Sequence, residues 1–129
     1  MKQAVLAILL VGFSAAAQAE WTKVGTSHLD TNVYFDADTT RREGNTAHAW
    51  VLFDLAKPRQ TARGPIHSFK TLNGFNCKDG KFWSVSRIFH AGQMGTGQVV
   101  DSYDTPLTWM SVIPGSGLEA IMRHACGKK

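Results

Sequence analysis

The chain has 129 residues, of which 14 are basic and 10 are acidic, and its formal net charge is +4. This mild excess is well short of the concentrated basic patch that nucleic-acid binding requires, so nucleic acid is not indicated as a partner. Beyond the N-terminal segment no apolar run is long enough to cross a bilayer, so we do not expect a membrane-spanning protein.

The first 19 residues have the pattern of a secretory signal peptide. Lys2 supplies a short positive start, residues 4–13 are apolar, and Ala17-Gln18-Ala19 forms a small-residue cleavage signal. A buried helix or an uncleaved anchor is the alternative, but the apolar run is shorter than the roughly 20 residues that span a bilayer. No lipobox cysteine stands at the cleavage point. We therefore expect a periplasmic or secreted protein with a single mature domain, residues 20–129.

The mature chain consists of short segments rich in aromatic and β-branched residues, separated by turn-forming residues, which is typical of antiparallel sheets. The predicted turns span residues 42–45, 57–59, 78–80 and 92–97. The pattern predicts an α+β fold in which a C-terminal helix packs on an antiparallel meander sheet of about five or six strands. The predicted strands are 21–27, 33–36, 46–55, 66–72, 81–91 and 98–103.

Two predicted strands indicate which residues share a face. In 46–55 one face is apolar and should be core, whereas the other mixes polar, aliphatic and aromatic residues and should be only partly covered. In 81–91 we expect Trp83, Val85, Phe89 and Ala91 to share a face that Arg87 interrupts. The apolar face of 46–55 has Ala47, Ala49, Val51, Phe53 and Leu55, and the mixed face has Thr46, His48, Trp50, Leu52 and Asp54.

The predicted helix follows Pro114-Gly115, where Ser116 can cap the first turn and Glu119 completes a capping box. Gly127 is placed to end it. One stripe of the helix should face the sheet. The residues of this stripe are Leu118, Ile121, Met122, Ala125 and Cys126.

Cys77 and Cys126 are the two cysteines of the chain. In an oxidising compartment an even pair predicts a disulfide, which would join the helix to the sheet. In the chain-entropy model, a bridge that closes the loop between positions 77 and 126 stabilises the fold by about 4 kcal/mol. A zinc site is the alternative, but structural zinc takes four ligands at short spacings and the chain has no C-x-x-C.

We find no convincing catalytic motif and predict that the protein is not an enzyme and has no metal site. The glycines of 92–97 resemble a phosphate cradle but lack a following Lys-Ser/Thr and helix, which favours a hairpin loop. Scattered histidines are the simplest interpretation of the five present, and a haem site built from His48 and a second histidine is the alternative. The histidines are His28, His48, His67, His90 and His124.

Basic residues form two small groups in predicted connections, Arg41 with Arg42 and, further along, Lys57, Arg59 and Arg63. Solvated loops are the default interpretation. The alternative is a contact surface for acidic proteins or polysaccharides, because arginine forks bind carboxylate and sulfate. We expect the tryptophans in the core, except that Trp50, beside His48, could belong to a binding surface. The tryptophans are Trp21, Trp50, Trp83 and Trp109.

Several motifs recur in the order found in one family of proteobacterial envelope proteins. They are Trp21-x-x-Val24, residues 33–36, Arg41-x-x-Gly44, residues 49–54, residues 68–77, and the stretch from Trp109 through Pro114-Gly115-Ser116 to Cys126. On these residues the mature chain resembles the surface-adhesin protein E family.

The resemblance implies an antiparallel sheet, a C-terminal helix and a sheet-to-helix disulfide. It also implies a surface protein that binds host matrix proteins and plasminogen, with haem binding and dimerisation. This chain lacks the lipobox cysteine of the family's lipoproteins, and no binding segment of theirs is found in it. We therefore expect an exported, non-enzymatic protein-binding module whose partner is an envelope component or a host matrix protein. The alternative is a periplasmic haem-binding protein.

Overall fold

The computed structural model describes residues 20–27 and 30–127, so the predicted signal peptide lies outside the described residues. No helix in the described part is long and apolar enough to cross a membrane. The elements in chain order are β1 (Trp21–Thr26), β2 (Asn32–Asp36), β3 (Arg41–Glu43), β4 (Thr46–Thr61), β5 (Gly64–Asn76), β6 (Lys81–His90), the 3₁₀ turn η2 (Gln93–Gly95), β7 (Val99–Tyr103), β8 (Met110–Ser111) and α1 (Gly117–Cys126).

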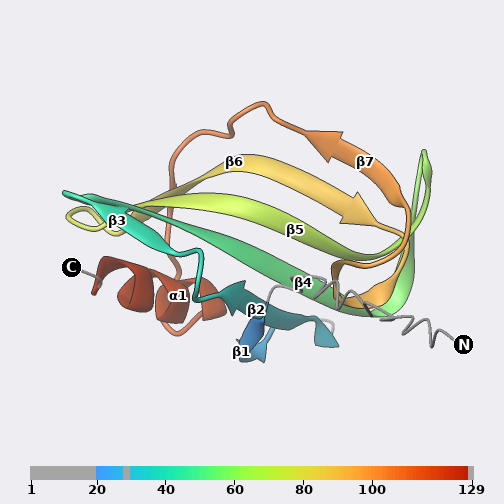
Figure 1. The fold of residues 1–129 in the computed structure, drawn as a ribbon, viewed down its shortest axis with the longest axis horizontal. Helices are drawn as coiled ribbons and strands as arrows, with labels where there is room; N and C mark the ends of the chain where they lie inside the picture. The colour runs from blue at the N-terminus through green and yellow to red at the C-terminus, as the bar shows by residue number, and fades with distance from the viewer. Residues whose placement is uncertain (1–19, 28–29, 128–129) are drawn as a thin grey trace, which may run out of the picture.

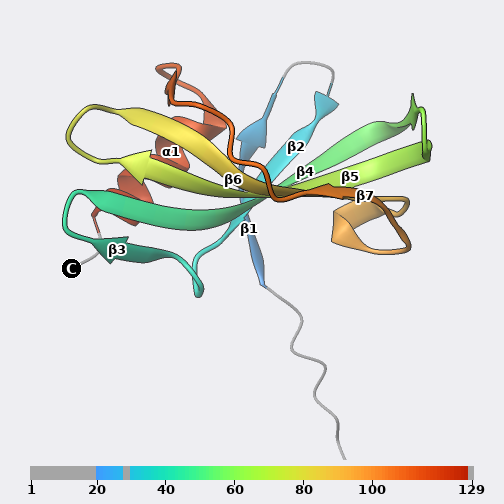
Figure 2. The same ribbon diagram turned by 90° about the horizontal axis from the view of Figure 1, so that it is seen from above.

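The strands form one antiparallel sheet with the order β1-β2-β4-β5-β6-β7, in which β3 adds to β4 and β8 adds to β6. Figure 1 shows α1 packed along one end of this sheet, and Figure 2 shows how strongly the strands twist across one another. The predicted antiparallel sheet with a C-terminal helix is therefore confirmed. The six strands of the main path correspond to the predicted ones, and the short strands β3 and β8 were not predicted.

The face of the sheet that packs against α1, here called the helix-side face, carries the core. Ala47, Ala49 and Phe75 are fully buried there beneath Ile121 and Ala125 of the helix. Small alanines on β4 let the helix approach closely, while each large side chain buried contributes about 1.5–3 kcal/mol. The opposite face of the sheet is called the outer face below. The predicted alternation in β4 is confirmed.

The ends of α1 follow from its sequence. The Ser116 Oγ accepts a hydrogen bond from the backbone N of Glu119 at 3.2 Å, and the Glu119 carboxylate accepts one from Gly115 N at 3.4 Å. The first bond satisfies an amide group that a helix N-terminus otherwise leaves free, and the second ties the residue before the cap to the helix. At the other end Gly127 N donates to the carbonyl oxygen of Arg123 at 3.0 Å. The predicted cap and stop are confirmed.

The disulfide between Cys77 and Cys126 is confirmed, with an Sγ–Sγ distance of 2.08 Å and Cα atoms 5.6 Å apart. Cys77 lies in the turn after β5, where its backbone N also donates to Asn45 O at 2.8 Å. The bridge joins this turn to the last residue of the helix. Since both thiols are consumed, the zinc alternative is excluded.

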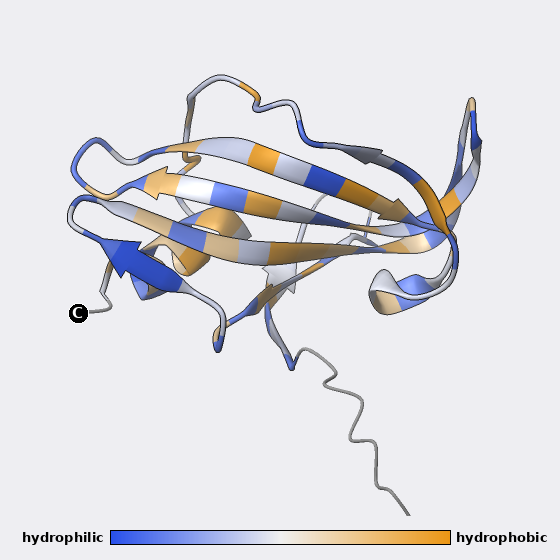
Figure 3. Ribbon diagram, turned by 45° about the horizontal axis from the view of Figure 1, so that its top comes forward, coloured by the Kyte–Doolittle hydropathy of each residue, from blue (hydrophilic) through white to orange (hydrophobic). Residues whose placement is uncertain are grey.

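Two predicted connections lie in strands. Residues 57–59 belong to β4, and Pro58, which has no amide to donate, falls where the pairing with β5 is interrupted between Asp54 and Arg59. Residues 41–43 form β3, because Gly44, with φ 59°, allows a two-residue turn back to β4. Figure 3 shows that β3 is hydrophilic along its length, unlike β4, β5 and β6.

The predicted shared face of Trp83 and Phe89 is wrong. Residue 84 pairs with Asn73 but residue 86 pairs with Leu72, so the register between β5 and β6 shifts by one residue. Such a bulge moves every following side chain to the other face. Trp83 consequently lies on the outer face, whereas Arg87 and Phe89 lie on the helix-side face.

Candidate functional site

Each face of the sheet is covered over only part of its length. Helix α1 covers the helix-side face at the end that carries β3, and the segment around η2 covers the outer face at the opposite end (Figure 1). Because of this diagonal arrangement, neither α1 nor η2 covers the outer face near β3. Side chains there are available to a partner.

The segment around η2 is fastened to the outer face by two polar side chains. Ser68 Oγ donates to the carbonyl of Gly92 at 2.6 Å and accepts from Gly95 N at 2.8 Å. A carboxylate oxygen of Asp54 accepts from Met94 N at 2.8 Å. The amides that a phosphate would need are thus already bonded, one of them to a carboxylate that would repel an anion.

Trp83 forms the floor of the open part of the outer face. It pairs with Gly74 of β5, and its indole ring occupies the space where a side chain at position 74 would lie, only 2.0 Å from the position of a Cβ. The edge of the ring contacts the imidazole of His48, with ring centroids 5.4 Å apart and planes at 81°. The Trp109 ring also packs against Trp83, with the ring centroids 4.2 Å apart.

Trp109 and Leu107 extend this aromatic floor into solvent, since they are 51% and 45% exposed. Together with Trp83, they line a shallow hollow of about 270 Å³ whose wall is completed by Pro106 and Thr108. Leu107 is held in place by a hydrogen bond from its backbone N to Ser84 O at 2.9 Å. Arg41, His48, Trp83, Leu107 and Trp109 are called the tryptophan surface below.

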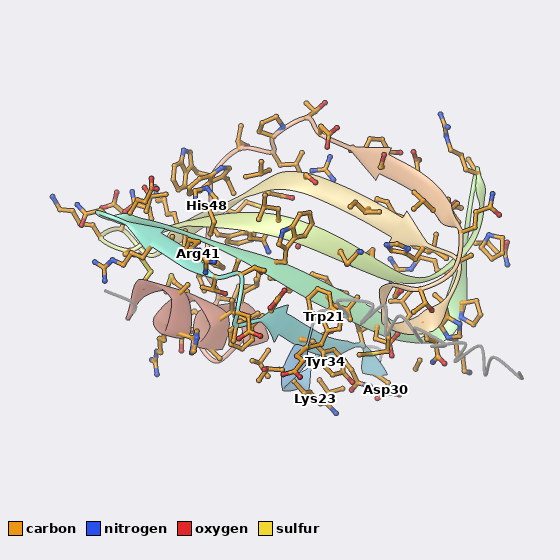
Figure 4. All side chains as sticks on the ribbon, in the orientation of Figure 1. Trp21, Lys23, Asp30, Tyr34, Arg41 and His48 are labelled. Atoms are coloured by element: carbon orange, nitrogen blue, oxygen red, sulfur yellow. A yellow bond between two sulfur atoms is a disulfide. The ribbon has the colours of Figure 1, made fainter. Side chains whose placement is uncertain are left out.

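Arg41 joins the tryptophan surface through the sheet register, because it pairs with His48, which pairs with Gly74. Figure 4 shows Arg41 and His48 at the same end of the sheet. The Nη1 of Arg41 donates to the carbonyl oxygens of Asp38 and Thr40 at 2.8 and 3.0 Å. Within the described residues its Nε and Nη2 have no hydrogen-bond partner. The guanidinium is thus held in place with donors left over.

Arg42 points to the other side of β3. Its Nη1 donates to the carbonyl oxygen of Cys126, and its Nε donates to Gly44 O at 2.9 Å. A cation at the last carbonyls of a helix interacts favourably with the helix dipole. Of the two neighbouring arginines, Arg41 therefore faces solvent on the outer face and Arg42 fastens β3 to α1.

The second basic group lies at the far end of the sheet. Lys57 and Arg59 are exposed on the end of β4, and Arg63 is in the turn before β5. Arg63 forms an ion pair with Asp101 at 3.6 Å. The predicted basic residues thus do not form one patch, and Arg41 is the one that pairs with His48.

The tryptophans differ in exposure. Trp50 is half-buried on the outer face, two residues beyond His48, so the expected neighbourhood of these two residues is present. Trp109, expected in the core, is half exposed because it follows a chain segment that runs along the edge of β6. Sequence analysis missed Trp83 and Trp109 as surface residues. The glycine at position 74, opposite Trp83, was the available signal.

The described histidines are distributed over different surroundings. His124 packs edge-on against Phe35 at 4.9 Å on the helix, and His67 lies on the helix-side face. His90 is buried beside Ser68 on the outer face, and burial, with a smaller effect of the Lys70 ammonium, lowers its pKa. Among the described residues no group of three or more metal-ligating side chains is gathered at one place.

A row of aromatic rings crosses the helix-side face beyond the reach of α1. Phe69 stacks on Phe53 at 4.7 Å and contacts Phe89 at 5.4 Å, and Phe89 in turn meets Tyr103 at 5.9 Å. The guanidinium of Arg87 lies over the Tyr103 ring, 5.4 Å from its centre. The three phenylalanines are half-buried and Tyr103 is 45% exposed, so the rings cover one another only in part.

Another hollow, about 950 Å³, lies between β1 and the N-terminus of α1. Val24, Val33 and Ile113 supply its apolar lining, and its charged residues, Glu119 and Arg123, pair with each other at 3.2 Å. It contains no aromatic side chain. Since binding energy concentrates on tryptophan, tyrosine and arginine, the tryptophan surface is the stronger candidate.

Comparison with known proteins gives a family and a fold. The family model described as "Surface-adhesin protein E" matches residues 21–127. Protein E of Haemophilus influenzae, in its crystal form II, superimposes with a TM-score of 0.65 at 14% identity, over 84% of this chain and 88% of that one. Protein E from non-typeable Haemophilus influenzae gives 0.63 at 14% identity, over 87% and 78%. No curated protein matches in sequence.

Proposed function

This chain belongs to the surface-adhesin protein E family, and we propose that it is an exported, non-enzymatic binding module that contacts a protein partner through the tryptophan surface. The partner would be an envelope component or a host matrix protein. Family membership supports a binding role, and the predicted signal peptide supports export. Residues 20–129 would form the mature domain.

The observation that carries the proposal is the exposure of aromatic and aliphatic side chains on the same face of the sheet as an arginine with free donors. Trp109 and Leu107 are about half exposed, and the Trp83 ring packs against Trp109. Scattered exposed apolar residues are ordinary, but tryptophan and arginine side chains gathered on one face have the composition of interface hot spots. Since Trp83 lies flat on the sheet, this surface is formed before a partner binds, which lowers the entropic cost of binding.

The test compares two substitutions of equally exposed apolar residues. The immobilised protein is exposed to an envelope extract and, separately, to host matrix proteins. Trp109→Ala should lose the retained partner, whereas Val99→Ala, at the opposite end of the sheet and also 51% exposed, should keep it. If Trp109→Ala retained the partner as well as the unmodified protein, the tryptophan surface would not be the contact.

Haem binding through His48 and a second histidine stays a prediction. The ring neighbour of His48 in the structure is Trp83, and none of the other described histidines is in ring contact with it. A haem titration checks it: a Soret shift that His48→Ala abolishes would support a haem site, and an unchanged spectrum would end that alternative.

A further inference from the structure

The tryptophan surface has two recognition elements at a fixed separation: an apolar hollow at one side and a cation at the other. Trp83, Leu107 and Trp109 line the hollow. Arg41, which keeps Nε and Nη2 without a hydrogen-bond partner among the described residues, provides the cation. A partner that uses both must present an apolar group and an anionic group at a matching distance.

The hollow is sized for a single side chain. Its volume of about 270 Å³ is below the range of about 300–1,000 Å³ typical of small-molecule pockets. Its lining is mainly aromatic and aliphatic, and its floor, Trp83, is held by contacts with His48 and Trp109. A partner residue that buries a leucine or phenylalanine side chain here would make the kind of anchor contact that dominates interface energies.

The sheet sets the spacing of the backbone positions that carry the two elements. Arg41, His48, Gly74 and Trp83 pair in one row across β3, β4, β5 and β6, so three strand spacings separate the backbone positions of Arg41 and Trp83. At about 4.8 Å per spacing this is about 14 Å. An extended peptide rises about 3.4 Å per residue, so four residues cover the same distance. Because successive side chains of an extended peptide alternate, positions i and i+4 point to the same side.

We propose that the tryptophan surface binds an extended peptide segment that crosses the strands, with an apolar anchor residue in the hollow and a carboxylate four positions away on Arg41. This inference rests on the proposed function and specifies its partner. The carboxylate would accept hydrogen bonds from the free donors of the Arg41 guanidinium, whose third nitrogen is already held by backbone carbonyls. His48 lies between the two ends of the segment.

The test uses synthetic peptides of glycine, serine and threonine that contain one phenylalanine and one glutamate, and binding is followed by tryptophan fluorescence. Spacings of three, four and five residues are compared in both chain directions. We expect the four-residue spacing, in one direction, to bind at least fivefold more tightly than the odd spacings. Replacing the glutamate by glutamine, or Arg41 by Gln, should remove this preference, whereas Arg42→Gln should keep it.

Equal affinity for all spacings, or an unchanged preference in Arg41→Gln, would overturn the inference. Failure of the inference is distinguishable from failure of the proposed function. If the peptides show no spacing preference but Trp109→Ala still loses the retained protein partner, only the peptide geometry is wrong. If Trp109→Ala also keeps the partner, the proposed contact surface is wrong as well.

Discussion

Gly74 and Trp83 face each other across β5 and β6, and the indole ring of Trp83 occupies the side-chain position that Gly74 leaves empty. Because Gly74 has no side chain, the Trp83 ring lies over it, flat on the sheet, instead of standing upright. His48 and Trp109 both pack against this ring. The binding surface proposed here therefore depends on the absence of a side chain as much as on the aromatic residues.

Arg41 and Arg42 should respond oppositely to substitution. Arg41→Ala should weaken partner binding and its dependence on salt while leaving stability nearly unchanged, because the side chain is exposed and bonds only to neighbouring carbonyls. Arg42→Ala should leave binding unchanged and lower the free energy of unfolding by about 1 kcal/mol, since it removes a charged bond to the last turn of α1. Thermal melts and binding isotherms of both variants check this, and a loss of binding confined to Arg42→Ala would refute it.

Removing the disulfide should destabilise the domain strongly. Cys77→Ala with Cys126→Ala should lower the free energy of unfolding by about 4 kcal/mol, because the bridge closes a loop with a sequence separation of 49 residues. Urea denaturation measures the change. Reductant should destabilise the unmodified protein to a similar extent and have no effect on the double variant. A midpoint that reductant leaves unchanged in the unmodified protein would show that the bridge does not form.

Asp54 should hold the η2 segment in place. Asp54→Ala leaves Met94 N without its acceptor, so the Met94 amide should exchange its hydrogen faster, at a cost of about 1–3 kcal/mol. Asp54→Asn keeps a side-chain oxygen at this position and should preserve most of the protection. Hydrogen exchange followed by mass spectrometry distinguishes the variants. Equal protection of the segment in Asp54→Ala would mean that Ser68 alone holds it.

Stability should fall at mildly acidic pH because of His90. Burial lowers the pKa of His90 below its ordinary value of 6.5, so below that pH the unfolded chain binds more protons than the folded one. The stabilisation from neutral His90 is complete above about pH 6.5 and is lost as the pH falls below it. His90→Gln should flatten this dependence in urea titrations at pH 7.5 and 5.5, with His48→Gln as the control. An identical slope in His90→Gln would assign the effect to other groups.

Local patterns predicted much of the fold. The capping box at Ser116 and Glu119, the alternation in β4 and the cysteine pair each involve short-range rules, and the structure agrees with them. Short-range rules do not predict which side chains lie on the outer face. The one-residue register shift opposite Asn73 and Leu72 depends on how β5 and β6 pair, and a period of two along β6 alone assigns Trp83 and Phe89 to the same side.

The candidate site was predicted in part. His48 and Arg41 were identified from composition and position, but their place in one row with Trp83 depends on pairing across four strands. Arg42 was grouped with Arg41 because the two are adjacent in sequence, whereas adjacent residues of a strand point to opposite faces. Trp109 lies in a segment that runs along the edge of β6. This segment has no sequence periodicity from which its path could be predicted.

The most direct test of the tryptophan surface as the binding site is partner retention by Gly74→Ala. A Cβ at this position would lie 2.0 Å from the Trp83 ring and must displace it, whereas Gly25→Ala meets nothing within 4 Å and serves as the matched control. The account predicts that Gly74→Ala folds, as judged by circular dichroism, but retains at least tenfold less partner than the unmodified protein, while Gly25→Ala retains it fully. A folded Gly74→Ala that retains the partner undiminished would contradict it.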